Sequence, residues 1–202
     1  MNNLQCIPVG PIATNVFLYY RQDEKLLLIV DPGAEAERIV AAAKKFDADR
    51  YIVLLTHAHI DHIAGLPELS RLLPLECVCL REPDHTMYWS KDNAILPLFP
   101  AAEGLPPVVS PVNVPGMEIL PVPGHTLGGS AFYFPQDGVL FAGDTLFDHS
   151  VGRTDLPGGS WQTLLHSIRE ILWQLPDDTQ VYCGHGPATT IGIEKRENPY
   201  VR

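Results

Sequence analysis

The amino-acid sequence predicts an α/β fold in which two β-sheets pack together with helices on the outside. Short apolar runs typical of strands occur in both halves of the chain, and helical patterns follow the strands of each half. The 202 residues are 46% hydrophobic, which is enough to fill one sizeable core or two small ones. Because no linker is evident, residues 1–202 are predicted to form a single domain.

In the first half, continuous apolar runs of about five residues indicate strands, and apolar residues three or four apart indicate helices. In order, the predicted elements are strands at 4–9, 15–20 and 26–31, a helix at 36–46, a strand at 51–55, a helix at 66–73 and a strand at 76–80. The proline-rich segment 83–115 has no clean period. It is predicted to be a helix fragment and a long loop in which Tyr88, Trp89 and Phe99 are exposed.

The second half repeats this pattern of strands followed by helices. Its predicted elements are strands at 118–122, 131–134 and 139–141, a helix at 161–172, a strand at 180–183 and a short helix at 193–197. Ser160 is the predicted N-cap of the longer helix, whose apolar stripe begins at Trp161.

Four metal-binding side chains lie directly after the predicted buried strand at 51–55, in the string Thr56-His57-Ala58-His59-Ile60-Asp61-His62. At the His and Asp frequencies of this chain, such a string arises by chance in roughly one chain in a thousand. In an extended segment His57 and His59 point to the same side, whereas Asp61 and His62 turn with the chain into the next helix. The string therefore predicts two neighbouring metal ions.

Three further candidate ligands, His125, Asp144 and His185, each follow a strand-like run and a glycine. They are needed because a catalytic zinc ion normally takes three protein ligands and a water molecule. The simplest assignment places His57, His59 and His125 on one ion, Asp61, His62 and His185 on the other, and Asp144 between the two. Cys183 is predicted to be a core residue rather than a metal ligand.

The three remaining histidines have weaker signals. His85 lies in a polar turn and His166 on the polar side of a helix, so both are predicted to be solvated. His149 follows the bridging aspartate by a few residues and is a further candidate for the cleft.

Composition limits the partners and the compartment. A formal net charge of −10 disfavours binding to nucleic acid or to an anionic membrane surface. The chain has no basic run followed by an apolar stretch at its start and no run of 18 apolar residues, and its four cysteines do not form a disulfide framework. We therefore expect a cytoplasmic protein. The sequence carries no signal for an oligomeric state.

The ligand string and the later His, Asp and His resemble the metallo-β-lactamase superfamily. Within it, the segments 143–147, 152–153 and 184–192 resemble the glyoxalase II branch, the hydroxyacylglutathione hydrolases. The resemblance implies a four-layer αβ/βα sandwich with two metals at one edge between the sheets. Arg153 matches a basic position that contacts glutathione in that branch, whereas Asp155 stands where those enzymes have a tyrosine. We expect no C-terminal helical glutathione-binding domain.

The function this implies is hydrolysis of a small-molecule thioester by a hydroxide that bridges two divalent cations, zinc being favoured over iron or manganese. Asp61 is predicted to orient the hydroxide and Arg153 to bind a carboxylate on the thiol portion. A thiolate, with a solution pKa of about 8.5, leaves without a strong general acid. The alternatives are a mononuclear iron persulfide dioxygenase, a lactonase or other hydrolase of the same fold, and a metal-binding protein without activity. For Arg153 the alternative is pairing with Asp155 or Asp148 to stiffen the loop.

Overall fold

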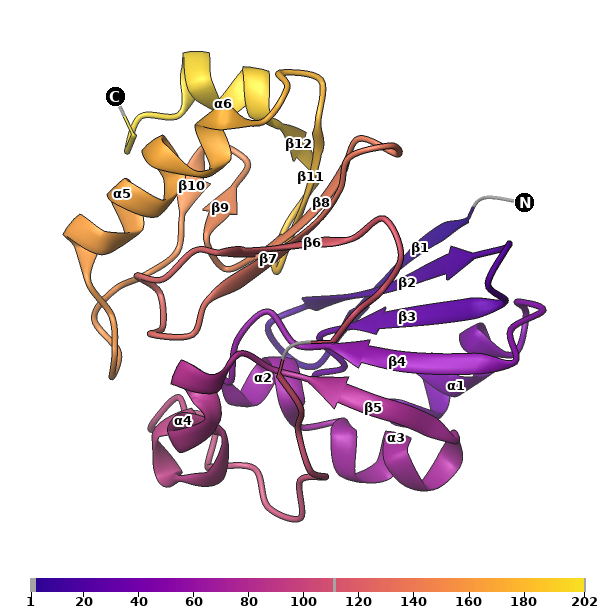
Figure 1. Ribbon diagram of the computed structural model, residues 1–202. Helices are drawn as coiled ribbons and strands as arrows, with labels where there is room; N and C mark the ends of the chain where they lie inside the picture. The colour runs from indigo at the N-terminus through magenta and orange to yellow at the C-terminus, as the bar shows by residue number, and fades with distance from the viewer. Residues whose placement is uncertain (1–2, 111, 202) are drawn as a thin grey trace. The chain divides into compact units, whose positions relative to one another are not determined.

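The computed structural model describes residues 3–110 and 112–201 (Figure 1). The chain divides into two compact units, Met1–Pro111 and Val112–Arg202, each with its own sheet and its own core. In Figure 1 the first unit runs from indigo to magenta and the second from red to yellow. The single domain that the sequence predicts stays a prediction.

The first unit contains a five-stranded sheet in the order β1-β2-β3-β4-β5. Its strands are β1 (Leu4–Val9), β2 (Thr14–Arg21), β3 (Leu26–Val30), β4 (Arg50–Leu54) and β5 (Leu75–Cys79). The pairs β1–β2 and β2–β3 are antiparallel, whereas β3–β4 and β4–β5 are parallel. All five residues of β3 are buried, as expected for a strand in the middle of a sheet.

Helices α1 and α3 lie side by side and share the main core of this unit with the sheet (Figure 1). The helices of the unit are α1 (Ala36–Ala43), α2 (Ile60–Ile63), α3 (Leu66–Leu72) and α4 (His85–Trp89), with 3-10 turns η1 (Glu82–Asp84) and η2 (Lys91–Asn93). Helix α1 ends three residues before its predicted end at Phe46. The backbone N–H groups of Lys45 and Phe46 bond to carbonyls only three residues back, which tightens the last turn.

The parallel strands of the first unit place their carboxyl ends at one edge of the sheet. Asp31 comes directly after β3, and Thr56 and His57 follow β4 after a single residue. In open sheets of this kind, that edge is where ligands bind. A Cβ atom added to Gly33 would lie 1.6 Å from the backbone oxygen of Asp61, so the turn after β3 lies directly against α2.

The second unit contains a five-stranded sheet in the order β12-β11-β8-β7-β6 and a separate hairpin. Its strands are β6 (Glu118–Pro121), β7 (Ser130–Phe134), β8 (Val139–Gly143), the hairpin strands β9 (Leu146–Phe147) and β10 (Ser150–Val151), β11 (Gln180–Cys183) and β12 (Thr189–Thr190). Strands β8 and β11 are parallel neighbours, with a register shift between Tyr182 and Cys183. The carboxyl ends of these two strands therefore meet at the same edge.

Helix α5 (Trp161–Glu170), the 3-10 turn η3 (Leu172–Gln174) and helix α6 (Ile191–Glu197) contribute to the core of the second unit. The predicted N-cap is confirmed, because the Ser160 side chain accepts a hydrogen bond from the backbone of Thr163. Leu164 and Ile168 are fully buried, but Trp161 is 43% exposed. The buried stripe of α5 thus begins one turn later than predicted.

The irregular parts of the chain differ from the prediction in two places. Tyr88, predicted to be exposed, is completely buried and donates a hydrogen bond to the carbonyl of Pro106 at 2.8 Å. Its neighbour Trp89 is 58% exposed, as predicted, and Phe99 is half-buried. The β9–β10 hairpin was not predicted, because strands of two residues leave no periodicity in the sequence.

Among the described residues, no helix has the length and apolar character needed to cross a membrane.

We predict that Gly33→Ala lowers the free energy of unfolding by about 3 kcal/mol, because its methyl group would overlap a backbone atom of α2. Gly104→Ala is the control. Gly104 has a φ of +68° and nothing within 4 Å of an added Cβ, so only backbone strain of about 1 kcal/mol is expected there. Denaturant unfolding measures both, and equal losses would contradict the close approach at Gly33.

Candidate functional site

Three imidazoles pack together at the carboxyl edge of the first sheet. His57 and His59 lie between β4 and α2, and His62 is in α2; each is at most 2% exposed. The ring centroid of His57 is 4.8 Å from that of His59 and 4.1 Å from that of His62. Asp61, also in α2, has its Oδ2 atom 3.3 Å from His62 Nε2 and accepts a hydrogen bond from the Thr14 hydroxyl at 2.9 Å.

Behind these imidazoles lies a buried carboxylate, Asp31, which is the last residue of the predicted strand 26–31 and was not among the predicted site residues. Asp31 is 2% exposed and has a φ of 51°. It accepts hydrogen bonds from the backbone N–H of Thr56 at 2.8 Å and from the Thr56 hydroxyl at 2.6 Å, and its Oδ2 lies 3.0 Å from His62 Nδ1. Because a carboxylate only accepts, His62 carries its proton on Nδ1 and keeps the lone pair on Nε2.

The same carboxylate also sets the proton position on His57, through Thr56. The Thr56 hydroxyl lies 3.0 Å from His57 Nδ1 and has already donated its single hydrogen to Asp31. It can only accept from His57, so His57 also has its proton on Nδ1 and its lone pair on Nε2. One buried carboxylate therefore selects the tautomer of two imidazoles.

Asp84 holds the intervening loop from the other side. It is completely buried in η1, and its Oδ2 accepts a hydrogen bond from the backbone N–H of Ala58 at 3.2 Å. This contact fixes the backbone between His57 and His59. Neither Asp31 nor Asp84 stands out in the sequence, where each reads as a polar residue of a proline-containing turn.

In the second unit, one carboxylate oxygen lies between two imidazoles. Asp144 comes directly after β8 and His185 follows β11, while His125 lies in the loop between β6 and β7. Asp144 Oδ2 is 3.6 Å from His125 Nε2 and 3.6 Å from His185 Nε2. A hydrogen bond of 2.8 Å from the Gly184 N–H to the Gly143 carbonyl ties the two strand ends together.

The orientation of His125 is set by backbone contacts. Its Nδ1 lies 2.7 Å from the carbonyl oxygen of Arg153, which only accepts, so the lone pair is on Nε2, the atom nearest Asp144. The backbone before His125 lies against α5, because a Cβ on Gly124 would be 2.3 Å from the backbone nitrogen of Leu164. Only glycine permits this approach, and its φ of +133° also favours glycine.

The donor set of each unit fits divalent metal ions. With bonds of about 2.0–2.1 Å in a tetrahedral arrangement, ligand atoms on one zinc ion lie about 3.3 Å apart. The contacts of Asp61 Oδ2 with His62, at 3.3 Å, and of Asp144 Oδ2 with two imidazoles, at 3.6 Å, are close to this separation. Imidazole nitrogen and carboxylate oxygen suit zinc and iron. That all seven predicted ligands bind one pair of ions stays a prediction.

Cys183 is a core residue, as predicted. It is 1% exposed, and burial raises the pKa of its thiol to about 12, which disfavours the thiolate that a metal requires. All four cysteines are free thiols.

The Arg153 side chain forms a bidentate ion pair with Asp155, with both N–O distances at 2.7 Å. This pairing lowers the pKa of Asp155 to about 2. This ion pair is one of the two pairings predicted as the alternative to a substrate-binding role for Arg153. The Arg153 side chain remains 53% exposed, and the pair uses Nε and Nη2, which leaves Nη1 for another acceptor.

The other three histidines have the following surroundings. His166 is exposed, as predicted. His85 was predicted to be solvated, but it is half-buried in α4 with Nε2 2.9 Å from the Leu80 carbonyl. His149 Nδ1 and Nε2 lie 2.8 Å from Asp148 and 3.4 Å from Glu197, and these carboxylates raise the pKa of His149.

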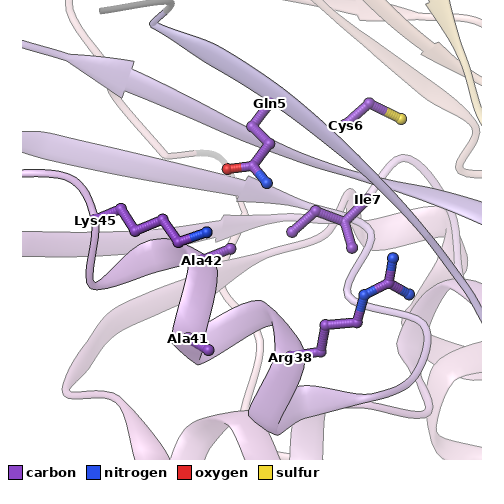
Figure 2. A pocket seen from close by; sticks show the side chains of 7 residues that line it. All are labelled: Gln5, Cys6, Ile7, Arg38, Ala41, Ala42 and Lys45. Atoms are coloured by element: carbon purple, nitrogen blue, oxygen red, sulfur yellow. The ribbon is translucent and has the colours of Figure 1, made fainter.

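A surface hollow of about 220 Å³ lies between β1 and α1 (Figure 2). Its lining residues include Gln5, Ile7, Arg38 and Lys45, and none of the predicted ligands is among them. Arg38 already donates to the Pro8 carbonyl and to Glu35, at 2.8 and 3.0 Å. Figure 2 shows Cys6 extending from the opposite side of the strand. The hollow is therefore a feature separate from the histidine clusters.

We predict that Asp31→Asn weakens metal binding roughly ten- to a hundredfold and lowers the free energy of unfolding by about 1–3 kcal/mol. Asparagine tolerates the positive φ, but its single oxygen cannot accept from both Thr56 groups and His62. Chelator competition and denaturant unfolding measure the two effects. Thr56→Ser, which keeps the hydroxyl, is the matched control, and wild-type metal affinity in Asp31→Asn would disprove the role.

The whole chain resembles known proteins of one family. A family model described as the metallo-beta-lactamase superfamily matches residues 9–185. Hydroxyacylglutathione hydrolase GloC of Haemophilus influenzae is 36% identical, and the match covers 98% of this chain and 98% of the relative.

Solved structures agree with this match. The crystal structure of BLEG-1, described as a B3 metallo-beta-lactamase, is 33% identical with a TM-score of 0.85, covering 98% of this chain and 99% of that chain. That of TTHA1623 in a di-iron-bound form is 34% identical with a TM-score of 0.86, covering 97% and 99%. The predicted fold class is confirmed. With a family match over most of its length and full-length relatives above 30% identity, this chain belongs to the metallo-beta-lactamase superfamily.

Proposed function

We propose that this protein hydrolyses small-molecule thioesters with the help of two divalent cations. The proposed ligands are His57, His59, Asp61, His62, His125, Asp144 and His185. The observation that carries the binuclear assignment is the position of Asp144, whose Oδ2 lies 3.6 Å from the Nε2 atoms of two histidines. The substrate class is supported by the full-length relationship to a hydroxyacylglutathione hydrolase.

When bound, the two cations lower the pKa of a water molecule toward neutrality and polarise the substrate carbonyl. Zinc is the proposed ion, and the di-iron form of one relative supports iron as the alternative. No protein nucleophile is then needed.

The residues of the chain position the reactants. Thr14 donates to Asp61 Oδ2 and so orients that carboxylate, which accepts a hydrogen bond from the attacking water. The Nδ1 contacts of His57, His62 and His125 keep their Nε2 lone pairs available. A thiolate leaves without a strong general acid because its conjugate acid has a pKa of about 8.5.

Arg153 is the proposed anchor for a carboxylate on the thiol portion of the substrate. Its side chain is half-exposed, and the guanidinium already binds one carboxylate in the bidentate geometry that such an anchor uses. A substrate carboxylate would bind at Nη1 or take the place of Asp155. In a chain of net charge −10, this cation offsets repulsion of an anionic substrate.

Metal analysis combined with a thioester hydrolysis assay tests the main proposal. We expect two ions per chain and thioesterase activity, and we expect Asp144→Asn to lose metal and roughly a hundredfold or more of the activity. Asp148→Asn, which removes a nearby exposed carboxylate, is the control. One iron per chain with oxygen uptake would point instead to the dioxygenase reaction, and two ions retained by Asp144→Asn would contradict bridging.

For Arg153→Ala we predict a roughly tenfold higher KM, equivalent to about 1.4 kcal/mol, for an anionic thioester, with kcat nearly unchanged. A neutral thioester should be affected little. Asp155→Ala separates the two roles of the arginine because it breaks the ion pair but leaves the guanidinium in place. If Asp155→Ala reproduces the defect of Arg153→Ala on both substrates, the arginine only stiffens the loop.

A further inference from the structure

A buried carboxylate on α6 binds the backbone of the β9–β10 turn. Glu194 is 1% exposed, and its Oε2 accepts hydrogen bonds from the His149 N–H at 3.0 Å and from Asn198 Nδ2 at 2.8 Å. Its Oε1 accepts from the Thr189 hydroxyl at 2.6 Å. Three donors thus compensate the burial of this charge.

Asn198 completes the attachment of the hairpin. Its Nδ2 donates to the carbonyl of Ser150 at 3.0 Å as well as to Glu194, and its Oδ1 accepts from the Tyr200 N–H at 3.0 Å. Glu194 and Asn198 together therefore bind two successive residues at the corner of the hairpin through their main-chain groups. The hairpin strands have only two residues each, too few to hold their position through their own ladder.

The chain leaving this hairpin lies directly against two of the proposed metal ligands. The Gly152 N–H bonds to the Thr145 carbonyl at 3.3 Å. A Cβ on Gly152 would lie 1.8 Å from the backbone oxygen of Asp144 and 3.4 Å from the Cβ of His125. The next carbonyl, that of Arg153, accepts the hydrogen bond from His125 Nδ1.

We propose that Glu194 and Asn198 are positioning residues for His125. They hold the hairpin so that the Arg153 carbonyl stays at 2.7 Å from Nδ1 and keeps the imidazole in one tautomer and one orientation. A carbonyl on an unanchored loop would not select the tautomer. The inference rests on the proposed function only in taking His125 as a metal ligand.

The test reads the His125 tautomer directly, by long-range ¹H–¹⁵N NMR of the imidazoles in the full-length chain after metal removal. Wild type should show one tautomer with the proton on Nδ1. Glu194→Ala and Asn198→Ala should show averaging between the two tautomers. Asn198→Asp should behave like Asn198→Ala, because it loses the donor to Ser150 and places a second carboxylate beside Glu194.

Two variants separate positioning from general stability. Glu194→Gln should restore the wild-type spectrum, because one amide oxygen can accept from His149 and Asn198 while the amide N–H donates to Thr189. Lys195→Ala is the control on the same helix. It breaks an ion pair with Asp177 of 2.7 Å that does not involve the hairpin, and it should leave the spectrum unchanged.

Zinc affinity, measured by chelator competition on the same proteins, provides the second readout. Glu194→Ala and Asn198→Ala should weaken the binding of one of two ions roughly tenfold, with Lys195→Ala unchanged. Glu194→Ala and Asn198→Ala proteins that fold and keep the wild-type tautomer would overturn the proposal, as would equal losses in Lys195→Ala. If Glu194→Ala does not fold, the Asn198 variants decide. If the wild-type protein shows a single His125 tautomer but binds no zinc, the proposed function is refuted and the positioning role of Glu194 and Asn198 is not.

Discussion

The hydrogen bond that an imidazole donates at Nδ1 determines whether its Nε2 has a lone pair available for a metal ion. Three histidines of this protein depend on such a bond. His62 bonds to Asp31, His57 bonds to Thr56, which is itself held by Asp31, and His125 bonds to the Arg153 carbonyl. Each acceptor places the proton on Nδ1 and leaves the Nε2 lone pair for a metal. Without these acceptors, buried imidazoles would change tautomer, and the donor set could not bind a cation as one preformed group.

Within each unit, the strand order brings the side chains of its histidine and aspartate cluster to one edge of the sheet. In the first unit, parallel strands β3 and β4 lead into Asp31 and into the loop that carries His57. In the second, parallel strands β8 and β11 lead into Asp144 and His185, and the register shift at the end of β11 coincides with the approach to His185. Rigid sheets thus carry the proposed ligands on short loops, which limits how far each side chain can move.

Most of the regular structure follows from the spacing of apolar residues. The strands of more than two residues and the longer helices were predicted to within a few residues because their periodicity reports burial directly. The errors have physical reasons. Tyr88 is buried because its hydroxyl finds the Pro106 carbonyl, a partner far along the chain. The β9–β10 hairpin is too short for a period, and it is held by Glu194 and Asn198, which lie more than forty residues away.

By itself, the sequence determined the chemical character of this protein. The string from His57 to His62 and the later His125, Asp144 and His185 predict imidazole and carboxylate ligands, because the density and spacing of these residue types are rare by chance. Only the tertiary structure decided which groups orient those ligands. Asp31, Asp84, Glu194 and the Arg153 carbonyl act through hydrogen bonds that depend on distance and direction, and such bonds join residues with no fixed separation along the chain.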